Sequence, residues 1–315
     1  MIRQLTTFTP LQQELSCDSN KNYLFDLAYL GGIHVAGERA SEFLQGQLSC
    51  DLREVNEQQM RKGALCDLKG RILALLDVVS WSGHGFQLIL PRDLLPRTKA
   101  SLAKTAMFSR VTLHSENNYQ LFGFHCQNEN DLIPFNLKLF NTPYDVLQQD
   151  NYCCYCLGNN FYIFLVHNNH TQTLRDQFST CSQYRGSLAW HALQLQQKRI
   201  EIYPESRGLF LPHRLGLQLS DYLSFNKGCY KGQEIIARTH YRAKLKHELK
   251  IFKITTNENL RVGQKIVNDK GNVEIGELVD FCPLENNQYL IAASVLLEYS
   301  QPVRFEDHKN TLALT

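Results

Sequence analysis

The amino-acid sequence predicts an α+β fold that ends in a small β-barrel. Strand-like and helix-like segments alternate between residues 23 and 116, whereas the residues from 246 onward form only short β-like runs separated by turns. With 43% hydrophobic and 20% charged residues, the 315-residue chain has a globular composition and is long enough for two or three domains. Its net charge of +2 gives no overall electrostatic preference for nucleic acid or membrane.

The first part of the chain predicts the order β-α-β-β-α-β, which is that of a split βαβ, or ferredoxin-like, unit. Gly31 and Gly32 are expected to break the first strand, and residues 82–85 are expected to form a hairpin turn. The expected elements are a strand at 25–36, a helix at 40–48, paired strands at 63–81 and 86–90, a helix at 93–107 and a strand from 111.

A second α+β part follows, and the chain ends in the β module. Its expected strands and helices lie at 121–125, 152–157, 161–167, 171–178 and 187–198. Turns at 263, 269–271 and 285–287 divide the last part into short strands. We therefore expect a ferredoxin-like domain at 1–116, a second α+β domain at 117–245 and a β-barrel at 246–315.

The targeting and cysteine patterns indicate a cytoplasmic protein with reduced thiols. Residues 1–20 lack the apolar core of a secretory signal, and the apolar stretches 72–79 and 289–297 are too short to span a bilayer. Ten cysteines in such a chain favour free thiols over a disulfide framework. We expect no membrane partner and a monomer.

Two spacings match those of metal ligands, but we interpret the residues as ordinary structural or surface side chains. Cys153 and Cys156 have a CxxC spacing, but on a strand Cys154 and Cys156 share one face and Cys153 points to the other. These cysteines are therefore interpreted as buried thiols. His167 and His170 follow a strand in a polar segment and are interpreted as solvent-exposed. No metal site is predicted.

Residues 227–234, with the sequence KGCYKGQE, form the segment most suggestive of chemistry. They follow an expected strand end at 223–225 and precede an expected helix at 234–242. Gly228 and Gly232 permit positive φ and a close approach to a ligand. Cys229 is expected near the helix N-terminus between two lysines, a setting that lowers the pKa of a thiol. A structural cysteine in a glycine turn is the alternative interpretation.

Positive charge is concentrated around this segment. Residues 227–253 contain eight Lys or Arg against Glu234 and Glu248. Such a stripe suits an anionic ligand, such as a polyglutamate tail, or a nucleic-acid backbone. A solvated helix face is the alternative, and the charge pattern does not decide between them.

The 227–234 octet closely resembles the K-G-C-aromatic-x-G-Q-E signature of YgfZ-type proteins, a group within the glycine-cleavage T-protein superfamily. Further similarity lies in FLQGQLSCD at 43–51, CDLKGR at 66–71, FSRV at 108–111 and FLP at 210–212. The resemblance covers residues 23 to about 245. It implies three domains around a central folate pocket and a role in maintaining iron–sulfur enzymes, including those that modify tRNA.

The resemblance also implies the site. Cys229 matches the functionally required cysteine, Phe225 and Tyr230 are expected to provide walls, and Lys244 is expected to add positive charge. Tetrahydrofolate or another reduced folate is the expected cofactor, and iron–sulfur enzymes are the expected partners. The residues predicted to contact folate are Asp51, Gln196, Lys227, Gly228, Tyr230, Gly232, Gln233, Glu234, Arg238 and Arg242.

Two positions depart from the family pattern. Where the transferases carry a catalytic Asp, this chain has the apolar Leu73 and Ala74, so it lacks an obvious carboxylate for aminomethyl transfer. Asp77 lies farther along the strand and is interpreted as a strand-end residue that faces solvent. Gln196 stands where a pterin-binding Glu is expected, and the amide forgoes a charge-assisted hydrogen bond.

Three functions therefore remain open on the sequence. The first is a folate-binding factor that uses Cys229 in iron–sulfur cluster assembly or repair, by thiol redox chemistry or by iron ligation. The second is a tetrahydrofolate-dependent aminomethyl or one-carbon transferase. The third is direct binding of tRNA by the positive stripe, although no RNA-binding module signature occurs.

Overall fold

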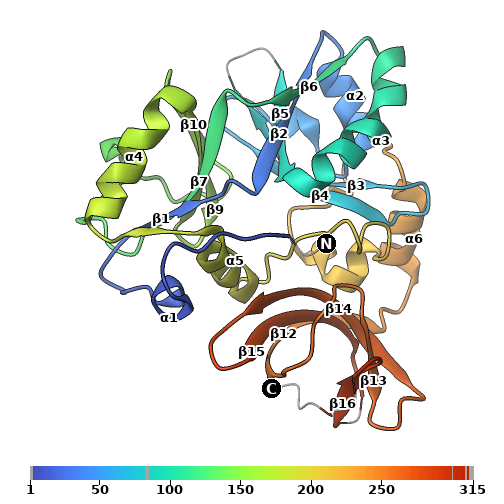
Figure 1. Cartoon of the computed structure of the whole chain (residues 1–315). Coiled ribbons are helices and arrows are strands. Elements are labelled where there is room, and N and C mark those ends of the chain that lie inside the picture. The colour runs from blue at the N-terminus through green and yellow to red at the C-terminus, as the bar shows by residue number, and fades with distance from the viewer. Residues whose placement is uncertain (1–2, 82–84, 300, 309–310, 312–315) are drawn as a thin grey trace.

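The computed structural model describes residues 3–81, 85–299, 301–308 and 311. Three β-sheets form the corners of a triangular arrangement, and helix α5 (Ser187–Gln196) lies near its middle (Figure 1). The remaining α-helices are α1 (Leu11–Leu15), α2 (Ala40–Gln47), α3 (Leu95–Phe108), α4 (Asn168–Thr180) and α6 (Gln233–Arg242). None of the described helices is both long and apolar enough to cross a membrane.

The first sheet has five antiparallel strands, with α2 and α3 beside it in Figure 1. Its expected pairing of the strands on either side of the 82–85 turn is confirmed, and residues 82–84 of that turn lie outside the described residues. In spatial order the strands are β3 (Arg61–Cys66), β4 (Ile72–Ser80), β5 (Phe86–Pro91), β2 (Leu30–Ala36) and β6 (Thr112–Glu116).

The second sheet has six strands, one of which comes from the N-terminal region. β1 pairs antiparallel with β7 and parallel with β11, while α4 packs against the sheet. In spatial order the strands are β11 (Tyr184–Arg185), β1 (Tyr23–Asp26), β7 (Tyr119–His125), β10 (Phe161–His167), β9 (Tyr152–Gly158) and β8 (Val146–Gln148).

The predicted first strand is interrupted at a different place from the one expected. The break falls at residues 27–29, and β1 and β2 enter different sheets. Gly31 and Gly32 lie within β2 instead of breaking it. A Cβ on Gly32 would lie 2.0 Å from the Tyr119 hydroxyl oxygen, so this glycine allows a side chain of the second sheet to approach the first.

The predicted C-terminal β-barrel is present as a curled antiparallel half-barrel (Figure 1). Its buried side chains, including Phe252, Ile291 and Phe305, form a separate apolar core. In spatial order the strands are β12 (His247–Thr255), β15 (Gln288–Leu296), β14 (Glu274–Pro283), β13 (Lys265–Asn268) and β16 (Val303–Phe305).

The cysteine predictions on β9 are confirmed. Cys153, Cys154 and Cys156 are free and buried. Cys154 and Cys156 pack in one core, whereas Cys153 packs in the core on the other face of the sheet. His167 is more constrained than expected, because its ring packs against Trp81 with 4.8 Å between ring centroids. The expected strand end at 223–225 is irregular backbone.

Candidate functional site

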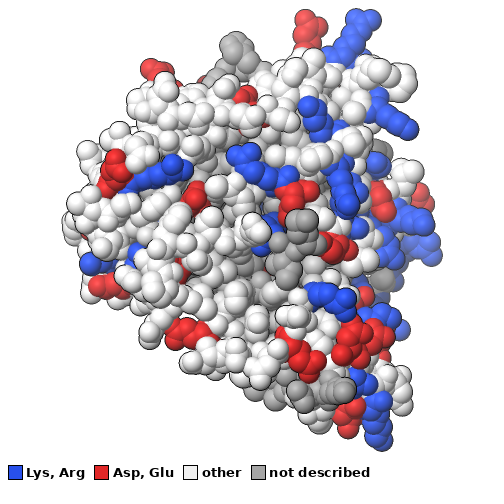
Figure 2. Space-filling view, in the orientation of Figure 1, with Lys and Arg blue, Asp and Glu red and all other residues white. Residues whose placement is uncertain are grey.

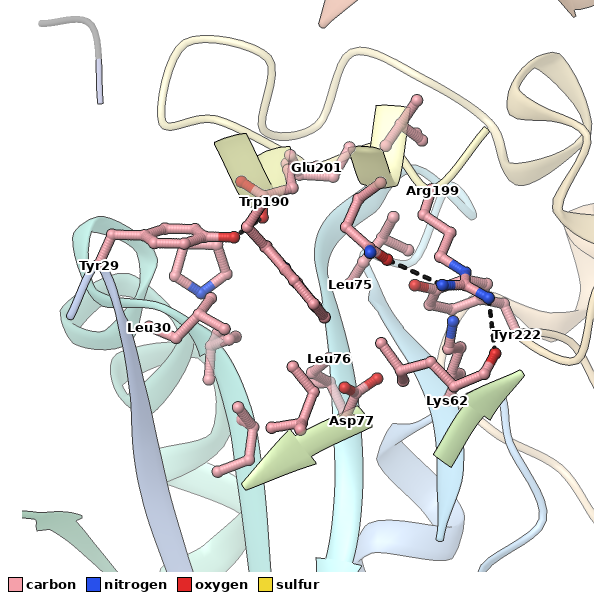
Figure 3. Close-up of a pocket in the computed structure, with 18 residues that line it drawn as sticks. Tyr29, Leu30, Lys62, Leu75, Leu76, Asp77, Trp190, Arg199, Glu201 and Tyr222 are labelled. Atoms are coloured by element: carbon pink, nitrogen blue, oxygen red, sulfur yellow. Dashed lines mark hydrogen bonds between the residues drawn. The ribbon is translucent and has the colours of Figure 1, made fainter. Parts of the chain in front are cut away.

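A central cavity of about 90 Å³ lies between the first sheet, the second sheet and α5 (Figure 3). In the figure, Tyr29 and Trp190 lie on one side of the cavity, Arg199, Tyr222 and Lys62 lie on the other, and Asp77 lies between them. The lining residues are Tyr29, Leu30, Lys62, Leu75, Leu76, Asp77, Ile89, Leu90, Pro91, Leu157, Ile163, Trp190, Gln194, Arg199, Ile200, Glu201, Ile202 and Tyr222. Apolar walls with a few charged groups are typical of a ligand site.

Asp77 and Lys62 are cross-strand partners on β4 and β3. The Asp77 carboxylate accepts a hydrogen bond of 2.9 Å from the Tyr155 hydroxyl. Burial raises the pKa of Asp77, and the positive charge of Lys62 opposes that shift. The expectation that Asp77 ends a strand and faces solvent is therefore wrong, because Asp77 lies within β4 and lines the cavity.

The Lys62 side chain is 6% exposed and lies near two aromatic faces. Its ammonium nitrogen is 5.8 Å from the centroid of the Tyr144 ring and 5.5 Å from that of Tyr222. Burial lowers the pKa of Lys62 to about 8, and the charge of Arg199 acts in the same direction, whereas Asp77 opposes it. The cavity thus holds an amine that loses its proton more readily than an ordinary lysine.

Arg199 is fixed in place by neutral acceptors. It donates to the Gln194 side chain at 2.9 Å and to the backbone carbonyls of Leu157 and Gly158 at 2.7 and 3.1 Å (Figure 3). Its guanidinium forms no ion pair with a carboxylate among the residues that the structure describes. The positive charge of Arg199 is therefore available to a ligand.

A second carboxylate reaches the cavity from the segment after α5. Glu201 accepts a hydrogen bond of 2.6 Å from the Tyr29 hydroxyl and forms an ion pair with Arg3. Arg3 also binds Asp93 through two hydrogen bonds of 2.9 Å. Each carboxylate oxygen of Glu201 therefore already has one partner, Tyr29 or Arg3, and the residue also lines the cavity.

The central cavity adjoins an outer cavity of about 480 Å³, which opens beside the half-barrel. The residues that line both are Lys62, Leu157, Arg199, Ile200 and Tyr222. The outer cavity is also lined by residues of the 213–220 segment and of β12. A ligand longer than the central cavity could therefore extend past Lys62 and Arg199 into the outer cavity.

The predicted 227–234 motif occupies a different place, at the edge of the first sheet. Lys227 is 8% exposed, and its ammonium donates to the carbonyls of Gln45, Leu48 and Cys50 at 2.8, 2.7 and 2.6 Å. These carbonyls lie at and just after the end of α2. Lys227 therefore ties the motif to the C-terminus of that helix.

Other motif residues also contact protein. Gly232 begins α6 with φ of 84°, and a Cβ there would lie 2.4 Å from the Asp67 carbonyl oxygen. Tyr230 is buried beneath Lys227, whose ammonium nitrogen is 5.1 Å from the ring centroid. The close approach that Gly232 permits is thus to the turn between β3 and β4. Gly228, Gln233 and Glu234 line none of the cavities described here.

Asp51 supports the same loop. Its carboxylate accepts hydrogen bonds from Gln45 at 3.0 Å and from Arg53, and the hydrogen bonds from Arg53 hold the pKa of Asp51 well below its ordinary value. Arg53 in turn donates to the Asn226 carbonyl at 3.3 Å, directly before the motif. Asp51 also lines a side cavity of about 450 Å³ together with Phe225.

Cys229 and the positive stripe lie on the surface. The Cys229 side chain is exposed and four residues before the start of α6. Arg238, Arg242 and Lys244 are exposed as well. Figure 2 shows Lys and Arg gathered along the edge of the molecule on which α6 lies in Figure 1. The structure thus separates the predicted cysteine segment from the central cavity.

Gln196, the predicted pterin contact, is the last residue of α5 and is exposed. Gln194, two residues earlier, lines the cavity instead. Sequence reasoning did not select Lys62, Arg199 or Glu201. A usable signal existed for Asp77, which is the single charged residue within the apolar strand β4, whereas Lys62 follows Arg61 at the start of β3 and stood out less. Arg199 and Glu201 lie in an irregular segment and gave no such signal.

Among the residues that the structure describes, no group of three or more His, Cys, Asp and Glu is placed to hold a metal ion.

The fold can be compared with that of solved structures. The structure has the fold of glycine cleavage aminomethyltransferases. It matches the crystal structure of glycine cleavage system aminomethyltransferase T from Bartonella henselae with a TM-score of 0.66, over 96% of this chain and 87% of that chain, at 15% identity. This likeness establishes the predicted fold.

The relatives found by sequence similarity indicate the group of proteins more specifically than the fold does. This chain is similar to the tRNA-modifying protein YgfZ of Colwellia psychrerythraea, with 26% identity over 73% of this chain and 71% of the relative. The corresponding values for the tRNA-modifying protein YgfZ of Yersinia enterocolitica are 28%, 74% and 72%. The resemblance to YgfZ-type proteins is thereby confirmed. No protein-family model matches the chain.

Proposed function

We propose that this chain is a folate-binding protein that supports tRNA modification, and that it does so through assembly or repair of iron–sulfur clusters. The names of its relatives and the aminomethyltransferase fold support the tRNA and folate parts of the proposal. The single structural observation that carries it is a central cavity in which aromatic and apolar walls surround Asp77 and Glu201.

The residues of this cavity fit a reduced pterin. A flat ring with N–H donors along one edge requires apolar walls and negatively charged or amide acceptors. Tyr29 and Trp190 supply aromatic surface, and the carboxylates of Asp77 and Glu201 supply acceptors. Arg199 and Lys62, at the boundary with the outer cavity, suit the carboxylates of a glutamate tail. Tetrahydrofolate, when bound, would supply a carrier for one-carbon units.

Calorimetry with tetrahydrofolate tests this assignment. We expect Asp77→Asn and Glu201→Gln each to weaken binding by about tenfold or more, because each loses a charge-assisted hydrogen bond worth roughly 1.5–3 kcal/mol. Gln196→Ala is the matched control, since Gln196 is exposed, and it should change the affinity less than twofold. Circular dichroism verifies that the variants fold. Equal affinity in all four proteins would place folate elsewhere.

Cys229 is the proposed functional thiol in iron–sulfur maintenance. Its support is its exposure on a loop that Lys227, Asp51 and Arg53 hold in a defined position. An exposed thiol on a fixed loop can meet a partner protein or an oxidant, which a buried thiol cannot. Redox chemistry and iron ligation both remain compatible with this placement.

A pair of cysteine variants tests that role. Cys181 is also exposed and free, so Cys181→Ala is a matched control for Cys229→Ala. In cells that lack the wild-type gene, we expect Cys229→Ala to lose most of the iron–sulfur enzyme activity and of the dependent tRNA modification. Cys181→Ala should retain both. If the two variants behave alike and both fold, Cys229 has no special role.

Asp77 favours a second candidate function, a tetrahydrofolate-dependent one-carbon transferase. The positions that match the transferase Asp are apolar, yet the structure brings the carboxylate of Asp77 into the cavity. A carboxylate there could orient a folate amine and stabilise a developing positive charge. Turnover of a carrier-bound aminomethyl donor by wild type, lost in Asp77→Asn, would favour the transferase over the binding protein.

A further inference from the structure

Lys62 and Lys227 are two buried lysines with opposite surroundings. The Lys227 ammonium donates to three carbonyl oxygens and so has a complete set of partners. The Lys62 ammonium forms no hydrogen bond and no ion pair with any residue in the described ranges. It lies near the rings of Tyr144 and Tyr222, and the carboxylates of Asp77 and Asp221 act on it from beyond ion-pair distance. A buried ammonium without a direct acceptor is unusual, because its desolvation is then offset only by more distant charges.

The position of Lys62 gives this amine access to small molecules. Lys62 lines both the central and the outer cavity, and Figure 3 shows its side chain beside Arg199 and Tyr222. Desolvation has the largest effect on the Lys62 pKa and favours the neutral amine, as does the positive charge of Arg199, whereas Asp77 and Asp221 act in the opposite direction. With a pKa of about 8, roughly a tenth of the Lys62 side chains are unprotonated at pH 7. These are the conditions that activate a lysine as a nucleophile.

Two neighbours complete a reaction site. Asp77, the cross-strand partner of Lys62, is a carboxyl group whose raised pKa suits it to accept and return a proton. Arg199 has neutral hydrogen-bond partners and no ion pair among the described residues, so its positive charge would attract a carboxylate. The central cavity adjoins the larger outer cavity, so a compound can reach Lys62 from outside.

We propose that Lys62 is a nucleophilic lysine that forms a reversible imine with a small 2-oxo acid in the central cavity. The Nζ lone pair attacks the carbonyl carbon, and a proton passes from nitrogen through Asp77 to the oxygen, which gives a carbinolamine. The nitrogen lone pair then expels this oxygen as water, and the second amine proton leaves with it. No electrons are exchanged with another reagent. Arg199 binds the carboxylate of the 2-oxo acid.

This proposal concerns the same cavity as the folate proposal but does not depend on folate. It is tested on the full-length wild-type protein with glyoxylate and cyanoborohydride at pH 7, without folate. The reductant converts an imine into a stable carboxymethyl amine, and peptide mass spectrometry locates it. We expect Lys62 to be modified at least about tenfold faster than Lys227 and the exposed Lys244. Modification of Lys62 no faster than these two lysines would overturn the proposal.

Because this comparison is made between lysines of one molecule, it does not depend on the folding of any variant. Variants then test the roles of Asp77 and Arg199. Asp77→Asn should slow the modification of Lys62, and Arg199→Gln should remove the preference for glyoxylate over acetaldehyde, a carbonyl compound without a carboxylate. An unchanged rate in Asp77→Asn would exclude Asp77 as the proton carrier, and an unchanged preference in Arg199→Gln would exclude a 2-oxo acid as the substrate class.

Discussion

At the scale of single residues, Lys227 is a buried charged residue with a structural role. Lys227 is largely removed from solvent, and its ammonium donates to three carbonyl oxygens at and just after the end of α2. The loop that carries Cys229 therefore depends on a contact between segments about 180 residues apart in the sequence. The lysine of the motif positions the cysteine and does not itself face a cavity.

Replacement of Lys227 by methionine should reduce stability. The variant keeps the length and the apolar part of the side chain but leaves three carbonyls without their donor, so we expect the free energy of unfolding to fall by about 1–3 kcal/mol. Urea denaturation measures this change. Lys244→Met, at an exposed position, is the control and should stay within about 0.5 kcal/mol of wild type. Equal effects of the two substitutions would contradict the anchoring role.

The residues of the two candidate sites differed in how far the sequence could predict them. The 227–234 motif is contiguous, so its glycines and its helix start could be predicted, and Gly232 does adopt a positive φ. The central cavity is assembled from residues that only folding brings together. Lys62 meets Asp77 through the β3–β4 register, which includes an irregularity after Leu65. Such a register cannot be derived from alternation of apolar residues alone.

At the scale of elements, a buried polar network joins α5 to the half-barrel. His191 on α5 binds the Asp280 carboxylate of β14 at 3.1 Å, and the Tyr203 hydroxyl donates to the same carboxylate at 2.7 Å. Burial alone would lower the pKa of His191, but the Asp280 carboxylate prevails and raises it to about 9. Glu201 adds negative charge nearby and Arg3 opposes it.

This network predicts a pH-dependent stability. A histidine whose pKa rises from about 6.5 to about 9 on folding stabilises the protein fully below pH 6.5, and the contribution disappears as the pH rises through 9. Its size is on the order of 3 kcal/mol. Urea denaturation at pH 6, 7.5 and 9.5 measures the free energy of unfolding. The difference between wild type and His191→Gln should become smaller at each step to higher pH.

The control for this measurement is His114→Gln, which changes an exposed histidine on β6. The free energy of unfolding of this variant should differ from that of wild type by less than about 0.5 kcal/mol at all three pH values. A gap for His191→Gln that stays constant or widens with rising pH would show that the histidine is neutral in the folded protein.

At the scale of the whole molecule, charge and cavities occupy different regions. The exposed positive residues gather on the edge near α6, while the central and outer cavities lie between the sheets (Figures 1 and 2). The expected fold class is confirmed, because alternation and turn signals are local properties. The entry of β1 and β2 into different sheets was not foreseen, since it depends on pairing with strands far along the chain.

The positive edge can be tested for direct binding of tRNA. We expect binding that weakens with salt, and in the double variant Arg242→Gln, Lys244→Gln the slope of log K against log salt should decrease by roughly 1–2. The control double variant Lys21→Gln, Lys138→Gln removes two exposed charges from segments beside the second sheet and should keep the wild-type slope. If both double variants show the same slope, the edge near α6 makes no phosphate contacts.

The pairing of β1 with β11 also constrains how a newly made chain can fold. Leu24 aligns with Tyr184, so the second sheet cannot be completed until the ribosome has released a polypeptide that extends past residue 185. The first sheet, whose strands lie between residues 30 and 116, can assemble much earlier. During translation the segment at 23–26 can pair with β7 once residue 125 has emerged, but its other edge lacks β11 until much later, and a chaperone that shields short apolar stretches could bind there.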